Sequence, residues 1–282
     1  MKDMIVAMLN ALSAGVTGST NDLLLSPDKY NHSLWQAALL INNVAVKPIS
    51  AIVLAIMLVL MLASNSTRIE GDSQMGVRII AGTMFKAVIV LAVAGMAVYF
   101  LDAINAIGTS IGTAANNVSF GGGSHGSDPK LGDQMSGAIG DAGTLQQIGM
   151  FIVIMIPWAA IEVVGVLSTV LIFVRFLQLY MLTAFASLPV VFFGHEETKS
   201  ISIGYLKRYA ATIIQGVVLI IAVKLYQALL SGWLGSTVKY HTGDDAWGFI
   251  VGNFGNFIVA PAVLAFLLFG ANSVAKAIVG EG

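Results

Sequence analysis

Residues 148–193 read IGMFIVIMIPWAAIEVVGVLSTVLIFVRFLQLYMLTAFASLPVVFF, and in this stretch only Glu162 and Arg175 carry a charge. As one helix the stretch would be about 69 Å long, more than twice the roughly 30 Å hydrocarbon core of a bilayer. It therefore crosses a membrane twice, or it crosses once and uses the rest for a re-entrant or interfacial segment. The choice between these two decides the topology of everything that follows.

The whole chain has the composition of an integral membrane protein. Of its 282 residues, 57% are hydrophobic and 10% are charged, whereas a soluble domain carries about 25% charged residues. The net charge of −1 provides no basic field for binding nucleic acid. The sequence has no cysteine, which excludes disulfides, thiolate metal sites and cysteine nucleophiles.

The apolar runs predict an all-α, polytopic integral membrane protein with five transmembrane helices. Amphipathic or interfacial helices are expected at the N-terminus, the first over residues 3–14 with Met4, Ile5, Met8, Leu9 and Leu12 on one face. Runs of spanning length follow at residues 44–63, 79–101, 148–172, 209–230 and 248–269. We expect Pro261 to break the last of these helices.

Residues 102–147 lie between the second and third spans and predict a helical excursion outside the bilayer. Helical spacing continues to Asn117, and a glycine-rich tip follows. We therefore divide the chain into interfacial helices, a transmembrane hairpin, an extracytoplasmic loop and a C-terminal transmembrane bundle, over residues 1–43, 44–101, 102–147 and 148–282.

Lysine and arginine are distributed unevenly among the loops. Residues 64–78, 195–208 and 273–282 hold six of them in 39 residues, whereas residues 1–47, 102–147 and 231–247 hold five in 110. The positive-inside rule makes the first set cytoplasmic, which places the N-terminus outside and the C-terminus inside. The long stretch then crosses once, over about residues 148–172, and a re-entrant or interfacial segment follows near residues 177–193. Six crossings are the alternative.

Polar side chains inside the spans are the candidates for function. A carboxylate near the middle of a span is costly, so Glu162 is a candidate pathway residue, and Lys86 lies within about 5 Å of its depth. The two could pair or line a watery cavity, and a protonated, hydrogen-bonded Glu162 is the structural alternative. Arg175 falls at the inner boundary, where it anchors the helix or shapes the re-entrant segment together with Gln178. Lys224 can extend its amine to the outer surface.

No motif indicates an enzyme. The four histidines are scattered over loops without ligand spacing, and neither a serine-nucleophile motif nor a phosphate-binding loop is present. We therefore expect no catalytic residue, no cofactor and no metal site. Gly248, Gly252 and Gly255 offer a small-residue face for helix packing.

Two stretches resemble a known family. They are VRFLQLYMLTAFASLP at residues 174–189, and the segment from SIGYLKR at residues 202–208 to Gln215 and Gly216. Together with the long outer loop and the polytopic layout, they are similar to the TrbL-like inner-membrane subunit of conjugative type IV secretion systems. The closest similarity is to the forms found in conjugative elements of Gram-positive bacteria.

This resemblance implies a channel or platform subunit in the bacterial cytoplasmic (inner) membrane, forming a ring-like homo-oligomer. Its implied partners are membrane lipids, the ATPases and extracytoplasmic components of the secretion system, and transiently the DNA–relaxase substrate. Residues 102–147 contain one lysine and four aspartates, which argues against an electrostatic grip on phosphates. The glycines at the tip, Gly121, Gly122 and Gly123, are instead candidates for a gate.

A small-solute secondary transporter is the competing hypothesis. Glu162, Lys86 and the proline-interrupted spans favour it, because transporters place ionisable groups and broken helices at the substrate path. The short chain and the absence of an internal repeat favour the secretion subunit.

Overall fold

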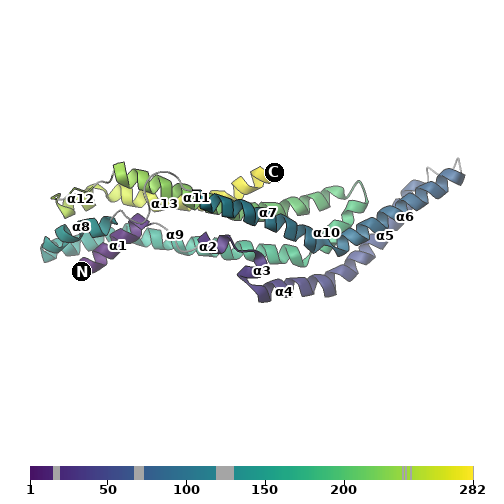
Figure 1. Cartoon of the computed structure of the whole chain (residues 1–282), viewed down its shortest axis with the longest axis horizontal. Coiled ribbons are helices and arrows are strands. Elements are labelled where there is room, and N and C mark those ends of the chain that lie inside the picture. Colours follow the sequence, from purple (N-terminus) through teal and green to yellow (C-terminus); the bar gives the residue numbers. More distant parts are fainter. Residues whose placement is uncertain are drawn as a thin grey trace. The chain divides into compact units, whose positions relative to one another are not determined.

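The computed structural model describes residues 1–14, 20–66, 73–118, 130–236, 238, 240–241 and 243–281. In these ranges every regular element is a helix (Figure 1). The elements are α1 (Lys2–Ala14), α2 (Thr20–Leu23), α3 (Pro27–Tyr30), α4 (His32–Ile41), a π-helical turn (Asn42–Val46), α5 (Lys47–Ser66), α6 (Ser73–Gly95), α7 (Ala97–Asn117), α8 (Leu131–Asp141), α9 (Thr144–Ala184), α10 (Ser187–Val191), a 3-10 turn (Phe192–Gly194), α11 (Lys199–Ser236), α12 (Ala246–Gly252) and α13 (Phe254–Val279).

Five helical stretches are long and apolar enough to cross a membrane. They are His32–Ala63, Gly76–Gly95, Thr144–Ala184, Lys199–Leu230 and Phe254–Val279. The predicted all-α polytopic fold with five spans is confirmed. The first stretch begins earlier than expected because α4 continues into α5 through the π-helical turn, which accommodates Asn42 and Asn43 without ending the helix.

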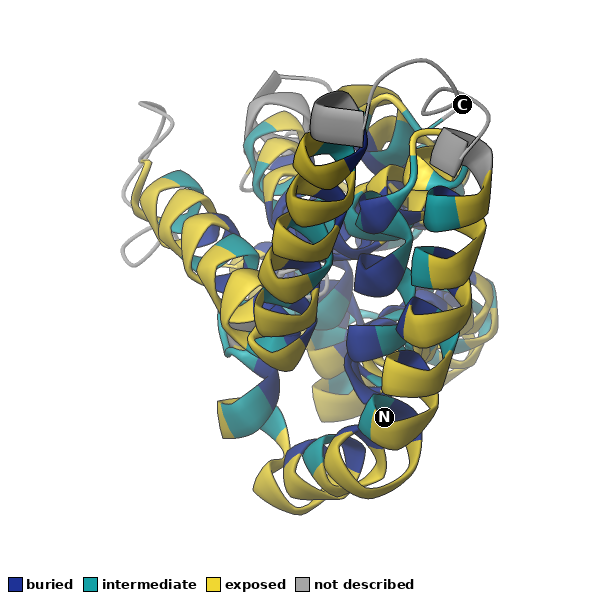
Figure 2. Cartoon of the chain, turned by 90° about the vertical axis from the view of Figure 1, so that its right-hand side faces the viewer, coloured by how far each residue is buried: buried dark blue, intermediate teal, exposed yellow. Residues whose placement is uncertain are grey.

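The exposed surface of these helices is apolar. Figure 2 shows exposed residues along the outer sides of the long helices. They include large side chains that water would solvate poorly, such as Val77, Phe85 and Phe266, which are 69–81% exposed. Exposed apolar surface of this extent is expected of helices that face lipid.

The long stretch at residues 148–193 consists of one helix and a short continuation. α9 is unbroken from Thr144 to Ala184, so residues 177–184 of the expected re-entrant segment continue the span. Phe185 and Ala186 interrupt the helix, and α10 with the 3-10 turn completes the segment. α10 packs against α5 and α6.

The expected break at Pro261 is wrong, because α13 runs through this proline. The interruption lies at Asn253, between α12 and α13. There the backbone N–H and the side-chain Nδ2 of Asn253 both donate to the carbonyl of Phe249, at 3.0 and 2.9 Å. A side chain that bonds to nearby backbone offers the chain an alternative to continuing the helix.

The described residues form two compact units. The first contains Met1–Leu24, Gly112–Phe173 and Val217–Asn272, and the second contains Leu25–Ile111, Val174–Gly216 and Ser273–Gly282. Helices α7, α9, α11 and α13 contribute residues to both units.

In the first unit, α1 packs closely on α8. The predicted amphipathic face of α1 is buried at Ile5, Met8, Leu9 and Leu12, whereas Met4 is exposed. From α8, Leu131, Met135 and Ile139 are buried. Close approach depends on Gly132, because a Cβ there would overlap the carbonyl oxygen of Val6. Asn10 strengthens the contact by donating from Nδ2 to Oδ1 of Asp133 at 2.9 Å.

Replacing Gly132 by valine is therefore expected to separate α1 from α8. Overpacking typically costs about 1–3 kcal/mol, which should lower the thermal unfolding midpoint of the purified protein. Gly137→Val is the matched control on the same helix, since nothing lies within 4 Å of a Cβ at that position. Equal unfolding midpoints for the two variants would contradict the close contact.

Candidate functional site

The interruption after α9 is the most unusual feature of the second unit. Pro189 explains it: proline has no N–H to pair with the carbonyl four residues earlier, that of Phe185, and its ring crowds that carbonyl. The helix tightens instead, and the N–H groups of Phe185, Ala186 and Leu188 each donate to the carbonyl three residues back. An interruption at membrane depth persists only if protein or water satisfies the freed backbone groups.

Asn42 satisfies one side of this interruption. It lies in the π-helical turn, is fully buried, and donates from Nδ2 to the carbonyl of Ala184, at the end of α9, at 3.2 Å. Its Oδ1 accepts from Oγ of Ser187, the first residue of α10, at 3.0 Å. One amide therefore ties together both ends of the break. Short π-helical turns often occur at functional sites.

Hydroxyl groups satisfy further carbonyls of the same segment. Two of the donors come from α11 and one from the turn that precedes it. The pairs are Tyr205 Oη to the Leu182 carbonyl at 2.8 Å, Ser202 Oγ to the Pro189 carbonyl at 2.6 Å, and Thr198 Oγ1 to the Phe192 carbonyl at 3.1 Å. We call Asn42, Thr198, Ser202 and Tyr205, with the segment Leu182–Gly194 that they hold, the break cluster.

Arg175 lies between α9 and α11 and is 5% exposed. Its Nε donates to the carbonyl of Thr212 at 3.1 Å, and its guanidinium carbon lies 4.9 Å from the ring centre of Phe176. Gly216 leaves room for the guanidinium, because a Cβ there would overlap it. The predicted role as an interfacial anchor does not account for this burial, since the side chain joins two helices of the bundle.

Aromatic side chains of α9 hold the N-terminal part of the second unit. Tyr30 stacks on Phe176 with ring centroids 3.8 Å apart, and Tyr180 donates from its hydroxyl to the carbonyl of Pro27 at 2.8 Å. Trp35 of α4 lies 6.5 Å from Tyr180, ring centre to ring centre. Helices α3 and α4 are thus fastened to the same part of α9 that carries Arg175.

The other predicted pathway residues are not members of the break cluster. Glu162 is exposed on α9, and Gln178 and Lys224 are half-buried. Lys86 lies 3.7 Å from the carboxylate of Glu196, Nζ to Oε1, and both side chains are substantially exposed. Lys86 therefore has a carboxylate partner in its own unit other than Glu162.

The glycines predicted to mediate helix packing are not those that make the close contacts between helices. Gly248 lies beside Asp245, whose Oδ2 caps α12 by accepting from the Gly248 N–H at 2.9 Å. In the described part of the chain, nothing lies within 4 Å of a Cβ placed at Gly252 or Gly255. Gly121, Gly122 and Gly123 lie outside the described residues. The tight glycine contacts between helices include Gly108 with Ile213, Gly149 with Trp247, and Gly216 with Arg175.

Asp102, near the start of α7, is a titratable group with a shifted pKa. Its side chain reaches the surface, yet the surrounding protein disfavours the charged carboxylate and, with the negative charge of Asp28, raises the pKa above its ordinary value. The charged form is therefore less favourable in the folded chain, so protonation of Asp102 contributes to stability as the pH falls.

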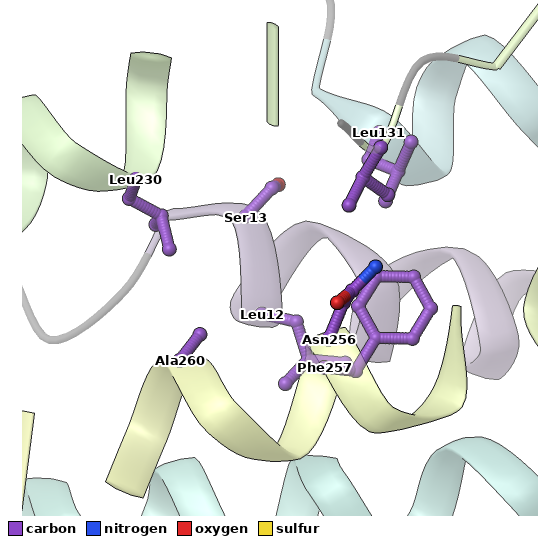
Figure 3. Close-up of a pocket in the computed structure, with 8 residues that line it drawn as sticks. Leu12, Ser13, Leu131, Leu230, Asn256, Phe257 and Ala260 are labelled. Atoms are coloured by element: carbon purple, nitrogen blue, oxygen red, sulfur yellow. The ribbon is translucent and has the colours of Figure 1, made fainter. Parts of the chain in front are cut away.

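A small pocket in the first unit is lined mainly by apolar side chains (Figure 3). Its polar members, Ser13 and Asn256, already donate to neighbours: Ser13 Oγ to the Asn10 carbonyl at 3.0 Å and Asn256 Nδ2 to Asn253 Oδ1 at 3.1 Å. Across the described ranges, no three His, Asp or Glu side chains are grouped as metal ligands. The two polar side chains of this pocket therefore hold neighbouring parts of the chain in place.

The break cluster could have been suspected from sequence at one position only. Asn42 is a polar residue at the edge of an apolar run, which is a signal of function in membrane helices. The residues that Asn42 bonds lie about 140 positions away in the sequence. Nothing in the sequence around Ser202 or Tyr205 indicates that their hydroxyl groups bind this segment.

Comparison with known proteins supplies the identity that the contacts leave open. No curated protein matches the chain. A family model described as TrbL/VirB6 plasmid conjugal transfer like protein matches residues 12–187. The match begins in α1, covers the first three candidate spans and ends at the first residue of α10, so it includes Asn42, Ala184 and Ser187. The chain therefore belongs to the TrbL/VirB6 plasmid conjugal transfer-like family, whose members are components of conjugal transfer systems.

Proposed function

We propose that this chain is a structural subunit of the membrane channel or platform of a conjugative type IV secretion system. It would support translocation of a DNA–protein substrate across the bacterial cytoplasmic membrane. The observation that carries this proposal is the family match over residues 12–187, which covers three of the five candidate spans. Membership also implies other subunits of the secretion system as partners.

The contacts in the second unit support a scaffolding role. The polar side chains of the break cluster bind backbone carbonyls, and Arg175 binds the backbone of α11. Such bonds fix the relative positions of helices within the unit. Because these side chains are engaged in holding helices together, we propose a structural rather than an enzymatic function.

The contacts give less support to a small-solute transporter. That hypothesis relies on Glu162 and Lys86 as a buried pair or as the lining of a shared cavity. Lys86 is instead paired with Glu196, and Glu162 is exposed on its helix.

We further propose that copies of the chain assemble into a ring, that the ATPases and extracytoplasmic components bind it, and that the DNA–relaxase substrate touches it transiently. Gly121, Gly122 and Gly123 remain proposed gate residues. The four-part division at residues 43, 101 and 147 also remains a proposal.

The functional proposal is tested by removing the gene from a donor cell that carries the whole conjugative element. Transfer of DNA to recipients should be lost and should return when the gene is supplied in trans. A photo-crosslinking residue at Ser110 of α7, in a donor engaged in transfer, should capture the passing DNA if the chain lines the path. Normal transfer without the gene would contradict the proposal, and crosslinking only to proteins would limit the chain to a platform role.

The orientation proposed is N-terminus outside and C-terminus inside. Because the chain has no cysteine, a single cysteine at Ser200, in the first turn of α11, can be labelled without background. We expect an impermeant maleimide to reach it only after cells are opened. Labelling of intact cells would contradict the five-crossing topology and favour the alternative of six crossings.

A further inference from the structure

Glu162 interrupts an exposed apolar face of α9. The residues that share this face have large aliphatic or aromatic side chains, and they extend over several turns on both sides of the carboxylate: Ile152, Met155, Ile156, Val163, Val166, Val170 and Phe173. Their spacing of three and four residues places them on one side of the helix. A membrane helix that turns such a face to lipid carries an ionisable group there only at a substantial cost.

Lys224 has a similar setting on α11. It is half-buried at the edge of a face on which Ile221 and Leu225 are exposed. Both Glu162 and Lys224 belong to the first unit. Within the described part of the chain, no ion pair involves either residue.

The two charges lie at nearly the same level along their helices. In the second unit α9 and α11 run antiparallel, and their contacts give similar registers: Tyr205 lies beside Leu182, and Thr212 and Gly216 lie beside Arg175. Because the helices are antiparallel, a step of one residue toward the C-terminus of α11 reaches the same axial level as a step of one residue toward the N-terminus of α9. Both helices continue without interruption, so Lys224 is level with about Val164, roughly 3 Å along the axis from Glu162.

We propose that the α9 face of one copy, through Glu162, binds the α11 face of a neighbouring copy, through Lys224. The surfaces are complementary: one presents a carboxylate among apolar side chains, and the other presents an ammonium group at the same depth. The two faces lie on different helices, so the contact is heterologous, and a repeated heterologous contact produces a ring when the rotation from copy to copy closes. This inference rests on the proposed assembly of copies and names the surfaces that form it.

The inference is tested by mixing two single-cysteine chains in one membrane, Glu162→Cys with one affinity tag and Lys224→Cys with another. A short bifunctional maleimide should join the two tags covalently. Ile152→Cys replaces Glu162→Cys in the control, because it lies on the same exposed face about 15 Å further along the helix. We expect the control to give at least about a tenfold lower yield of mixed dimer, since the reagent cannot span this offset.

Charge reversal provides the second measurement. Glu162→Lys alone and Lys224→Glu alone should each reduce the oligomeric fraction in native particles, and the combined variant should restore it. Failure to restore it, or a yield of mixed dimer no higher than that of the Ile152→Cys control, would overturn the inference. Crosslinking is measured in membranes and does not require DNA transfer. Its failure would overturn the proposed interface only. The proposed function would be contradicted by a different result, normal transfer in a donor that lacks the gene.

Discussion

The Gly216→Val variant is expected to lose the native packing of α9 against α11 and to be recovered mostly as aggregate. Its Cβ would overlap the guanidinium of Arg175, lying 2.6 Å from Nη2. The guanidinium cannot easily move, because Nε is bonded to the Thr212 carbonyl and the group lies over the ring of Phe176. Moving it would leave a buried cation without an acceptor, so overpacking and lost hydrogen bonding together cost about 3 kcal/mol or more.

The measurement is the fraction of purified protein that elutes as a single species, together with its thermal unfolding midpoint. Gly204→Val is the matched control, since it places the same β-branched residue on α11 where nothing lies within 4 Å. A smaller loss in the same direction is expected for Gly216→Ala. Indistinguishable behaviour of the valine variants at 204 and 216 would show that Arg175 does not require the glycine.

The Asn42→Leu variant is expected to destabilise the second unit strongly. Leucine is similar in size but makes neither of the amide's bonds, so the Ala184 carbonyl and the Ser187 hydroxyl lose their partner at a buried position. Each buried polar group left unpaired costs about 1–3 kcal/mol. We expect a lower unfolding midpoint and faster proteolysis between α9 and α11.

The Asn43→Leu variant is the control, because it removes an asparagine from the same turn at a position outside the Asn42 bridge. Asn43 occupies the same π-helical turn, but it is exposed and its Oδ1 accepts from Lys47 Nζ at 2.6 Å. Loss of an exposed contact of this kind should change stability by no more than about 1 kcal/mol. If the two leucine variants unfold alike, the Asn42 bridge does not hold the break together.

The number and type of the membrane helices followed from sequence. The apolar runs at residues 44–63, 148–172 and 209–230 each lie within a helical stretch long enough to span. This success has a simple physical cause, because the preference of a segment for lipid depends on its own length and composition. The amphipathic face of α1 was also correct except at Met4, since a periodic pattern reports which side is buried.

Helix interruptions were harder to predict. Pro261 lies inside a continuous helix, whereas Asn253 interrupts the chain eight residues earlier and Pro189 accompanies the break after α9. All three residues can end a helix by local chemistry. An interruption persists only where neighbouring side chains donate hydrogen bonds to the backbone carbonyls that the helix no longer pairs. This depends on the tertiary structure.

By itself, the sequence determined that this protein is a five-span, all-helical membrane protein and pointed to its conjugal transfer family. Both properties are carried by composition, by the lengths of the runs and by local motifs. Only the tertiary structure decided that Asn42 meets Ala184 and Ser187, that Gly216 accommodates Arg175, and that a Cβ at Gly252 or Gly255 would meet nothing within 4 Å among the described residues. Such contacts depend on the register between helices far apart in the chain, and the periodicity of one helix says nothing about which residue of another lies opposite.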